Sequence, residues 1–283
     1  MTYINYRLAT GGDTLFLSLC DWVEGITRQQ YDDLRAILRR TKDIELPCLR
    51  RRGEQLERLT NLKPRLIDCC PNGCIAYTGQ FEALDTCPAP CGEPRWYPKG
   101  SRRIPRQSFI FIPLTTRLLL QYRSRRRAFM LQSYCRPFFD QPLDRTPNEF
   151  TDWWGAKRYL ELRRQGLFSE PTDIALQLML DGVNLLNRST HSTTPVLCVN
   201  YNLPPAIQYQ KHNILLSLVI PGPGKYGNLD SFLHPLVEEL KDLGIGVDAF
   251  DSYRKQAFRL RAWPVVVTGR KSILYCPLLM TFR

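Results

Sequence analysis

No part of this chain restricts its folding more than the segment between residues 69 and 91, which holds five of the ten cysteines. Four of the five form two close pairs, Cys70 with Cys74 and Cys87 with Cys91. Asn, Gly and Pro stand inside or just after the pairs, and such residues let the backbone turn until both sulfurs of a pair face one point. Two turns of this kind supply the four thiolates of a structural Zn²⁺ site, with no position left open for water. We therefore expect a zinc-binding module over residues 67–98.

Two alternatives to this ligand set stay open. Cys69 stands beside Cys70 and could replace it, and the cysteines could also be buried or free thiols without a metal. Disulfides are disfavoured, because no segment has the basic start, apolar run and cleavage site of a secretion signal, and thiols stay reduced inside cells. No stretch approaches the roughly 18 apolar residues of a membrane span. We expect an intracellular protein without a membrane partner.

The charge of the chain indicates an anionic partner. Lys and Arg number 39 against 27 Asp and Glu, which gives a formal net charge of +12. Nucleic acid is the commonest anionic partner of a basic chain, although an unevenly charged, solvated surface is the plain alternative. The arginines that we expect to contact nucleic acid are Arg102, Arg103 and Arg106, in a basic linker, and Arg123, Arg125, Arg126 and Arg127, in a helix.

Apolar periodicity and turn residues predict the elements before residue 170 as mainly helical. They are helices within 13–40 and over 54–62, a strand over 109–112, a helix over 114–134, a proline-containing loop over 135–148, and a helix from Trp153 to Gly166. The two adjacent tryptophans, Trp153 and Trp154, are expected in the core, not on a base-stacking surface.

From Pro171 onward, apolar runs alternate with turns. We expect strands over 174–180, 195–200 and 213–220, then an amphipathic helix over 230–243 and a last strand within 258–268. Three strands, a helix and a further strand form an α/β core. Asp181 follows the first of these strands in an Asp-Gly pair, where a turn-capping role is the alternative to a chemical one.

Several stretches between Asp68 and Trp263 resemble the transposase of CACTA-type DNA transposons, the En/Spm or Tnp2 family, in its fungal form. They are IDCCPNGCIAYTG, CGEPRW, DIALQLMLDGVNLL, VNYNLPP, NILLSLVIPGPGK, DSFLHPLVEELKDLGIGVDAFD and FRLRAW. The resemblance implies a zinc module followed by an RNase H-like core of the DDE/D type, transposon-end DNA as partner, and a nuclear protein.

The fold class expected is therefore α+β. A helical region over residues 1–66 precedes the module at 67–98, basic linker and helices fill 99–170, and an incomplete RNase H-like core spans 171–283. Oligomerisation is compatible with this organisation.

Carried over to this chain, the first catalytic acid of the family falls on Asp181. The resemblance implies that this carboxylate and a second one would together hold Mg²⁺. The family places its second acid in a Gly-Asp pair after the strand that follows the helix, and here that pair is Gly269-Arg270. The third acid and the rest of the core do not follow. Asp248 and Asp251 are interpreted as surface or capping acids, not substitutes. The second cysteine pair is also one residue longer than the family pattern Cys-Pro-x-Cys-Gly.

These departures predict a truncated transposase fragment that binds DNA and zinc but does not cleave strands, with Mg²⁺ belonging only to the intact ancestral enzyme. A co-opted zinc-dependent adaptor for DNA or protein is the first alternative. A relic without a stable product is the second.

Overall fold

The computed structural model describes residues 28–42, 48–98, 103–143, 152–180, 183–184, 192–222 and 226–269. The chain divides into two compact units, Met1–Lys63 and Pro64–Arg283. The first contains helices α2 (Arg28–Lys42) and α3 (Leu49–Thr60). Helix α3 starts five residues before the expected helix at 54–62 and ends where Asn61 takes a left-handed conformation (φ 55°). The rest of the helical expectation at 13–27 falls outside the described residues.

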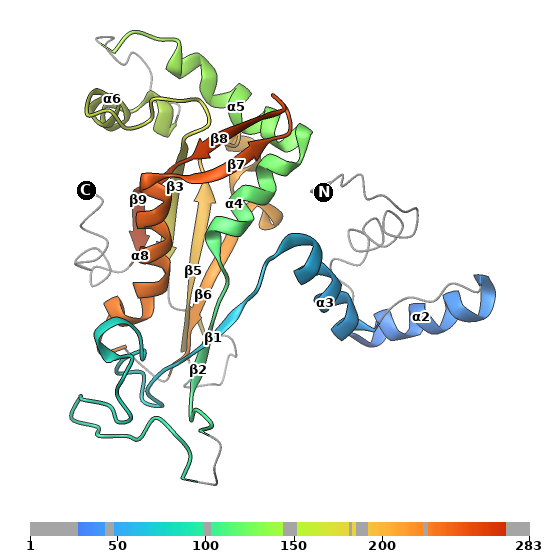
Figure 1. Ribbon diagram of the computed structural model, residues 1–283, viewed down its shortest axis with the longest axis vertical. Helices are drawn as coiled ribbons and strands as arrows, with labels where there is room; N and C mark the ends of the chain where they lie inside the picture. The colour runs from blue at the N-terminus through green and yellow to red at the C-terminus, as the bar shows by residue number, and fades with distance from the viewer. Residues whose placement is uncertain are drawn as a thin grey trace. The chain divides into compact units, whose positions relative to one another are not determined.

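The second unit is a mixed α/β structure built on one sheet, whose strand order is β1-β2-β6-β5-β3-β9 (Figure 1). Strands β3 and β9 run parallel, and the other neighbouring pairs run antiparallel. The strands are β1 (Arg65–Asp68), β2 (Ser108–Phe111), β3 (Ile174–Leu180), β5 (Ser192–Asn200), β6 (Leu215–Ile220) and β9 (Ala262–Gly269), with the short β4 (Val183–Asn184) paired to β5 off this path. The expected strands at 174–180, 195–200 and 213–220 are thereby confirmed.

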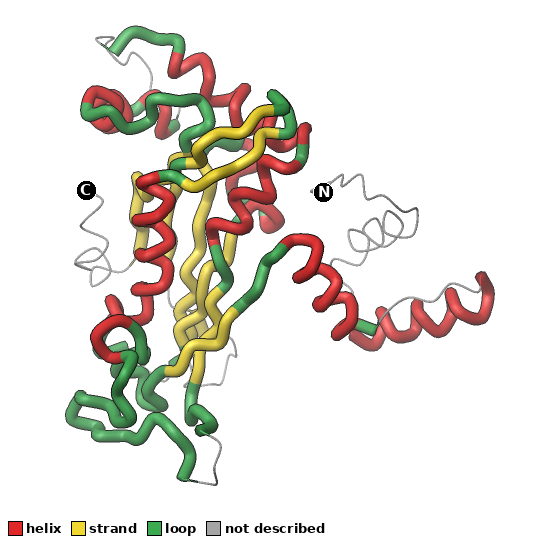
Figure 2. The backbone as a smooth tube through the Cα atoms, in the orientation of Figure 1, coloured by secondary structure: helices red, strands yellow, loops and turns green. Residues whose placement is uncertain are grey.

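The cysteine segment is inserted between two strands of this sheet. Strands β1 and β2 pair from Arg65 with Phe111 to Asp68 with Ser108, and β2 continues into the core through its pairing with β6. The intervening chain is mostly loop, with one short turn of helix, η1 (Gly79–Phe81) (Figure 2). The expected module, linker and core segments thus share one compact unit.

Strand β3 is buried along almost its whole length because both faces of the sheet are covered there. Its residues Ile174, Leu176, Leu178 and Leu180 belong to the main core, which includes the apolar side of helix α8 (Leu229–Ile245). Ala175 points to a second, aromatic core around Trp154 and Phe168, beside helix α6 (Lys157–Arg164). A strand covered on both faces has a continuous apolar sequence, as observed.

The prediction of one helix over 114–134 is wrong in extent. Two helices, α4 (Leu114–Arg123) and α5 (Arg125–Phe139), meet at Ser124. The backbone of Ser124 is extended (φ −86°, ψ 118°), and its hydroxyl accepts a hydrogen bond from the backbone N–H of Arg127. Helix α5 also continues through Pro137 into the stretch expected as a loop. Phe139 packs on Trp154 there, with ring centroids 5.7 Å apart. This tertiary packing thus compensates for the backbone hydrogen bond that the proline cannot donate within the helix.

A hairpin that was not predicted stands between α8 and β9, and the single strand expected within 258–268 is divided between the end of this hairpin and β9. The hairpin consists of β7 (Val247–Asp251) and β8 (Gln256–Leu260), and Arg261 separates it from β9. Val247 and Ala249 pack against the main core, while Asp248 and Phe250 are exposed. The alternation of core-facing and exposed residues in this hairpin is short, and it stands between two longer apolar elements, so it gave no clear strand signal.

The remaining described elements are short: η2 (Trp153–Gly155), α7 (Pro205–Gln208) and η3 (Lys211–Asn213). Trp154 is completely buried, as predicted for a core residue. Among the described helices, none has the length and apolar character required to span a membrane.

Candidate metal centre

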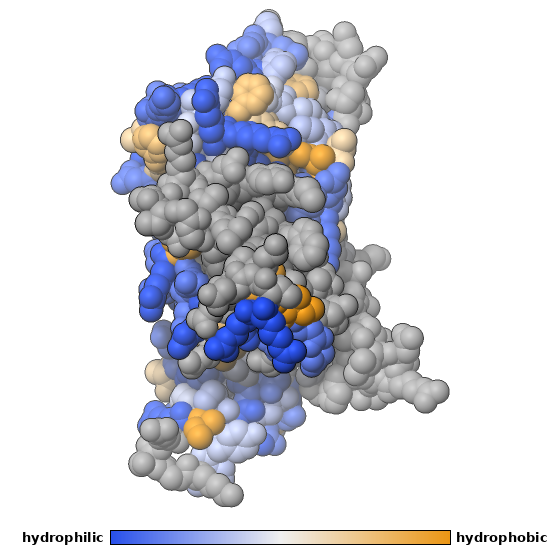
Figure 3. Space-filling view, turned by 90° about the vertical axis from the view of Figure 1, so that its right-hand side faces the viewer, coloured by the Kyte–Doolittle hydropathy of each residue, from blue (hydrophilic) through white to orange (hydrophobic). Residues whose placement is uncertain are grey.

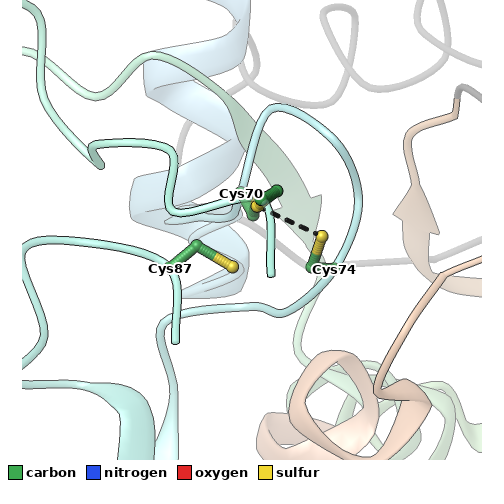
Figure 4. A group of neighbouring side chains, drawn as sticks. Cys70, Cys74 and Cys87 are labelled. Carbon is green, nitrogen blue, oxygen red and sulfur yellow. Dashed lines mark hydrogen bonds between the residues drawn. The ribbon is translucent and has the colours of Figure 1, made fainter. Parts of the chain in front are cut away.

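The structure brings Cys70, Cys74, Cys87 and Cys91 together, with their four Sγ atoms all within 4.8 Å of one another. Cys91 lies 3.6 Å from Cys70 and 3.5 Å from Cys74, measured between sulfurs. Figure 4 shows the side chains of Cys70, Cys74 and Cys87 turned toward a common small space.

These distances fit a tetrahedral thiolate site. A Zn–S bond of about 2.3 Å implies neighbouring sulfurs roughly 3.8 Å apart. The two sulfur pairs at 3.5 and 3.6 Å are close to this separation, and the remaining pairs need only small shifts to reach it. Four cysteine sulfurs without a carboxylate or water position would suit a structural Zn²⁺ ion. The arrangement could therefore hold a metal such as zinc.

Each pair sits on a tight turn. In the first, the Cys70 N–H donates to the Ile75 carbonyl (2.9 Å), and the Gly73 N–H donates to the Cys70 carbonyl (2.8 Å). Gly73 adopts a φ of 69°, which favours glycine. In the second, the Gly92 N–H donates to the Ala89 carbonyl (3.1 Å). The additional residue between Cys87 and Cys91 is accommodated within this turn, and it does not separate the sulfurs.

The thiols differ in acidity. Cys91 has its pKa lowered to about 7, chiefly by a hydrogen bond from the backbone N–H of Glu93, with the neighbouring thiols adding to the effect. Burial, together with hydrogen bonds to Cys91 and Cys70, raises the pKa of Cys74 to about 11. Burial also raises the pKa of Cys87. A bound cation would have to displace protons from Cys74 and Cys87 at neutral pH.

Cys69 stands apart from the cluster. It is fully buried in the main core with Ala76 and Phe109, and its backbone N–H donates to the Gln107 carbonyl (3.0 Å). Burial raises the pKa of Cys69 to about 12, with Cys70 and Asp68 adding to the shift. Of the two adjacent cysteines, only Cys70 has its sulfur in the four-cysteine group.

Arg95 supports the cluster from beside it, a role that sequence reasoning missed. Its guanidinium group binds Asp68 at 2.8 Å and stacks near the rings of Tyr77 and Trp96, 4.6 and 4.4 Å from their centroids. It also donates to the Glu82 carbonyl at 2.7 Å. The one available signal was a basic residue between Pro94 and Trp96 within a cysteine-rich loop.

The first cysteine turn is bonded to the start of helix α8. The Asn228 N–H donates to the Cys74 carbonyl (2.7 Å), and the Gly227 N–H donates to the Gly73 carbonyl (3.1 Å). The Ala76 N–H donates to Ser231 Oγ (2.9 Å), and the Thr78 hydroxyl donates to the Ser231 carbonyl. A side chain at Gly227 would meet the Cys74 carbonyl oxygen at 2.7 Å. Backbone at the cluster and backbone at α8 are therefore in direct contact.

The arginines expected to contact nucleic acid differ in their surroundings. Arg103 forms an exposed ion pair with Asp85, and Arg106 forms a half-buried ion pair with Glu93. Arg127 is largely enclosed, where burial lowers its pKa to about 10, and it donates to the Asn213 side chain at 2.6 Å. Arg123, Arg125 and Arg126 are exposed. Arg102 lies outside the described residues.

At the candidate acid site, the structure describes the strand ends but not the two residues that follow them. Asp181 and Arg270 lie outside the described residues, but the strands before them pair in parallel, and Leu180 lies opposite Gly269. Asp248 is exposed. Asp251 is completely buried, where its carboxylate accepts hydrogen bonds from the Tyr253 and Arg254 backbone, as expected for a capping acid.

Residues 144–269 match the model of a family described as Transposase family tnp2. The match supports a Tnp2-type transposase family. It begins after the cysteine cluster, spans β3 to β9, and stops at the residue before Arg270. No curated protein matches the chain.

Proposed function

We propose that this chain is a DNA-binding protein of the CACTA transposase type, with an RNase H-like core, a structural zinc module and no strand-cleavage activity. The observation that carries the proposal is the coincidence of the tnp2 match with the strand order of the sheet. Within residues 144–269, strands β3, β5 and β6 pair consecutively, helix α8 follows, and β9 returns beside β3 in parallel.

This order agrees with what the resemblance implies for the two metal-binding acids. One is expected after the first strand, and the other after the strand that follows the helix. Leu180 and Gly269 end adjacent parallel strands, and Asp181 and Arg270 come next in the sequence. A cation in place of the second carboxylate would repel Mg²⁺, so a two-metal mechanism lacks one of its ligands.

The cysteine cluster belongs to the same edge of the sheet. Strands β1, β6, β3 and β9 all end at that edge, because β3 and β9 are parallel and the intervening pairs alternate in direction. The cysteine segment leaves the sheet after β1, and the chain after β6 contacts Cys74. In this proposal, zinc would fix the loop structure beside the edge where the ancestral acids stood, and Cys70, Cys74, Cys87 and Cys91 would hold it.

Strand cleavage tests the catalytic part of the proposal. The purified chain is incubated with labelled duplex DNA carrying transposon ends, with Mg²⁺ or Mn²⁺, and we expect no nicking above a no-protein control. Metal-dependent nicking that Asp181→Ala abolishes would overturn the assignment.

Salt dependence tests the binding part. An arginine-rich surface that displaces counterions from several phosphates should lose affinity steeply as salt rises. Lack of binding to any DNA at low salt would remove nucleic acid from the proposal and leave the protein adaptor and the relic as the remaining alternatives.

A further inference from the structure

We propose that the exposed side of α5 and the turn of the β7–β8 hairpin form a binding site for unpaired nucleotides. Phe129 and Tyr253 would stack against bases, and Arg125 and Arg126 would contact phosphates. The inference rests on the proposed DNA-binding function and specifies the form of nucleic acid that this part of the surface takes.

Helix α5 presents an exposed stripe with an aromatic residue between basic ones. Its members are Arg125, Arg126, Phe129, Ser133 and Arg136, all exposed and spaced at helical intervals. The opposite side of the helix, including Ala128 and Leu131, is completely buried. Residues three and four apart lie next to each other on a helix, so Phe129 is a neighbour of both Arg125 and Arg126.

Tyr253 extends this aromatic surface from a different element. Its ring meets that of Phe129 edge to face, with centroids 4.9 Å apart. Phe129 is 48% exposed and Tyr253 is 39% exposed, so much of each ring faces solvent. Figure 1 shows the hairpin turn lying beside α4 and α5. On the face drawn in Figure 3, hydrophobic residues stand scattered among hydrophilic ones.

The turn that carries Tyr253 is fixed by hydrogen bonds to buried residues beneath it. Asp251 accepts hydrogen bonds from the N–H groups of Tyr253 (2.8 Å) and Arg254 (3.2 Å), and the Gln132 amide donates to its other oxygen (2.7 Å). The Ser252 N–H donates to the Tyr122 carbonyl at 3.1 Å. The aromatic pair is therefore preformed, and binding would not have to order it.

The charge beside the pair suits phosphate. In the described part of the chain, no carboxylate forms an ion pair with Arg125, Arg126 or Arg136. The nearby Asp251 is buried and occupied by hydrogen bonds. Arginine contacts to the phosphate backbone of DNA would by themselves suit duplex DNA equally well. Exposed rings gain from a base only where that base is unstacked, so the combination favours single-stranded segments.

Fluorescence anisotropy of the full chain with a labelled thirty-nucleotide oligo-dT and a labelled hairpin duplex tests the site. We expect Phe129→Leu and Tyr253→Ala each to weaken oligo-dT binding about 5- to 100-fold, as for loss of a stacked base, with duplex binding changed less than about twofold. Phe129→Trp keeps an aromatic ring and should retain oligo-dT binding. Arg125→Ala should weaken both complexes and reduce the salt slope by about one.

Equal losses on both DNAs, or unchanged oligo-dT binding in Phe129→Leu and Tyr253→Ala, would overturn the inference while leaving duplex binding intact. If the unmodified chain binds neither DNA at low salt, the proposed DNA-binding function itself fails. Thermal melting of each variant separates loss of a contact from loss of the fold, since both rings are substantially exposed.

Discussion

Arg95 ties together three parts of the cysteine segment through one planar group. It neutralises Asp68 at the end of β1, donates to backbone carbonyls near η1, and lies close to two aromatic rings. Its side chain is 14% exposed. A lysine could supply the charge but not the fork that reaches the carboxylate and the carbonyls together.

Arg95→Ala should therefore destabilise the second unit by about 3 kcal/mol, because it leaves Asp68 enclosed without its partner. Zn²⁺ affinity should fall about 10- to 100-fold, as for other supports of metal ligands. Urea denaturation and zinc competition measure the two effects. Arg95→Lys should give a smaller loss of each, and an unchanged zinc affinity in Arg95→Ala would contradict the role assigned here.

Gly227 lies directly against the cysteine turn, in the chain that leads into α8. Gly227→Ala should cost about 1–3 kcal/mol, because a methyl group would meet the Cys74 carbonyl oxygen at 2.7 Å and the backbone must shift. Gly53→Ala is a matched control: its site within α3 has open space, and alanine there should stabilise the helix by about 0.5–1 kcal/mol. Equal effects of the two substitutions on the melting temperature would refute the contact.

Strand β9 is joined to the segment before β3 by a second paired charge. The Arg261 guanidinium binds both carboxylate oxygens of Asp173, at 2.9 and 2.8 Å, and Asp173 is completely buried. Burial raises the pKa of Asp173, while a hydrogen bond from the Glu170 N–H and the Arg261 charge counteract this shift. This ion pair links the end of the hairpin to the start of the central strand.

Arg261→Met should destabilise the fold by about 3–5 kcal/mol at neutral pH, since a buried carboxylate loses its partner. The pKa of Asp173 should rise further in the folded variant. A group whose folded pKa exceeds its unfolded value contributes most below the unfolded pKa, so stability should decline as pH rises from about 4 through the folded pKa. Urea denaturation at several pH values checks the sign. A variant that becomes more stable over this interval would disprove it.

The second unit is one structure in which the cysteine segment, the sheet and α8 depend on one another. The segment starts and ends on paired strands, and its first turn is bonded to the residues that precede α8. Loss of a bound metal would therefore release contacts to the core as well as the loop itself. The metal would act on the whole unit and not on an independent module.

Zinc removal by a chelator should lower the melting temperature of the cooperative transition, with stabilisation of about 4 kcal/mol at a free zinc concentration 1,000-fold above Kd. Cys91→Ser should abolish zinc retention, and Cys48→Ser in the first unit should preserve it. An identical melting temperature with and without zinc would argue against a structural ion.

Zinc affinity should also rise with pH. At least two protons, from Cys74 and Cys87, must leave on binding, because burial keeps both thiols protonated near neutrality. Apparent affinity should increase by at least about 100-fold per pH unit between pH 6 and 7. Competition with a chromophoric chelator measures the slope, and a flat profile would exclude thiolate ligation by this pair.

The sequence by itself determined the central strands, helix α8 and the spacing of the four cysteines, because each depends on local periodicity or on short turns. It could not show that Ser124 divides a helix, that residues 247–260 form a hairpin, or that Arg127 is enclosed. Those outcomes depend on contacts between residues far apart in the chain: Phe139 on Trp154, Gln132 on Asp251, and Arg127 on Asn213. The choice between Cys69 and Cys70 was likewise decided in three dimensions. Adjacent residues of an extended chain point to opposite sides, and only the packed sheet makes one of those sides the core and the other the cysteine cluster.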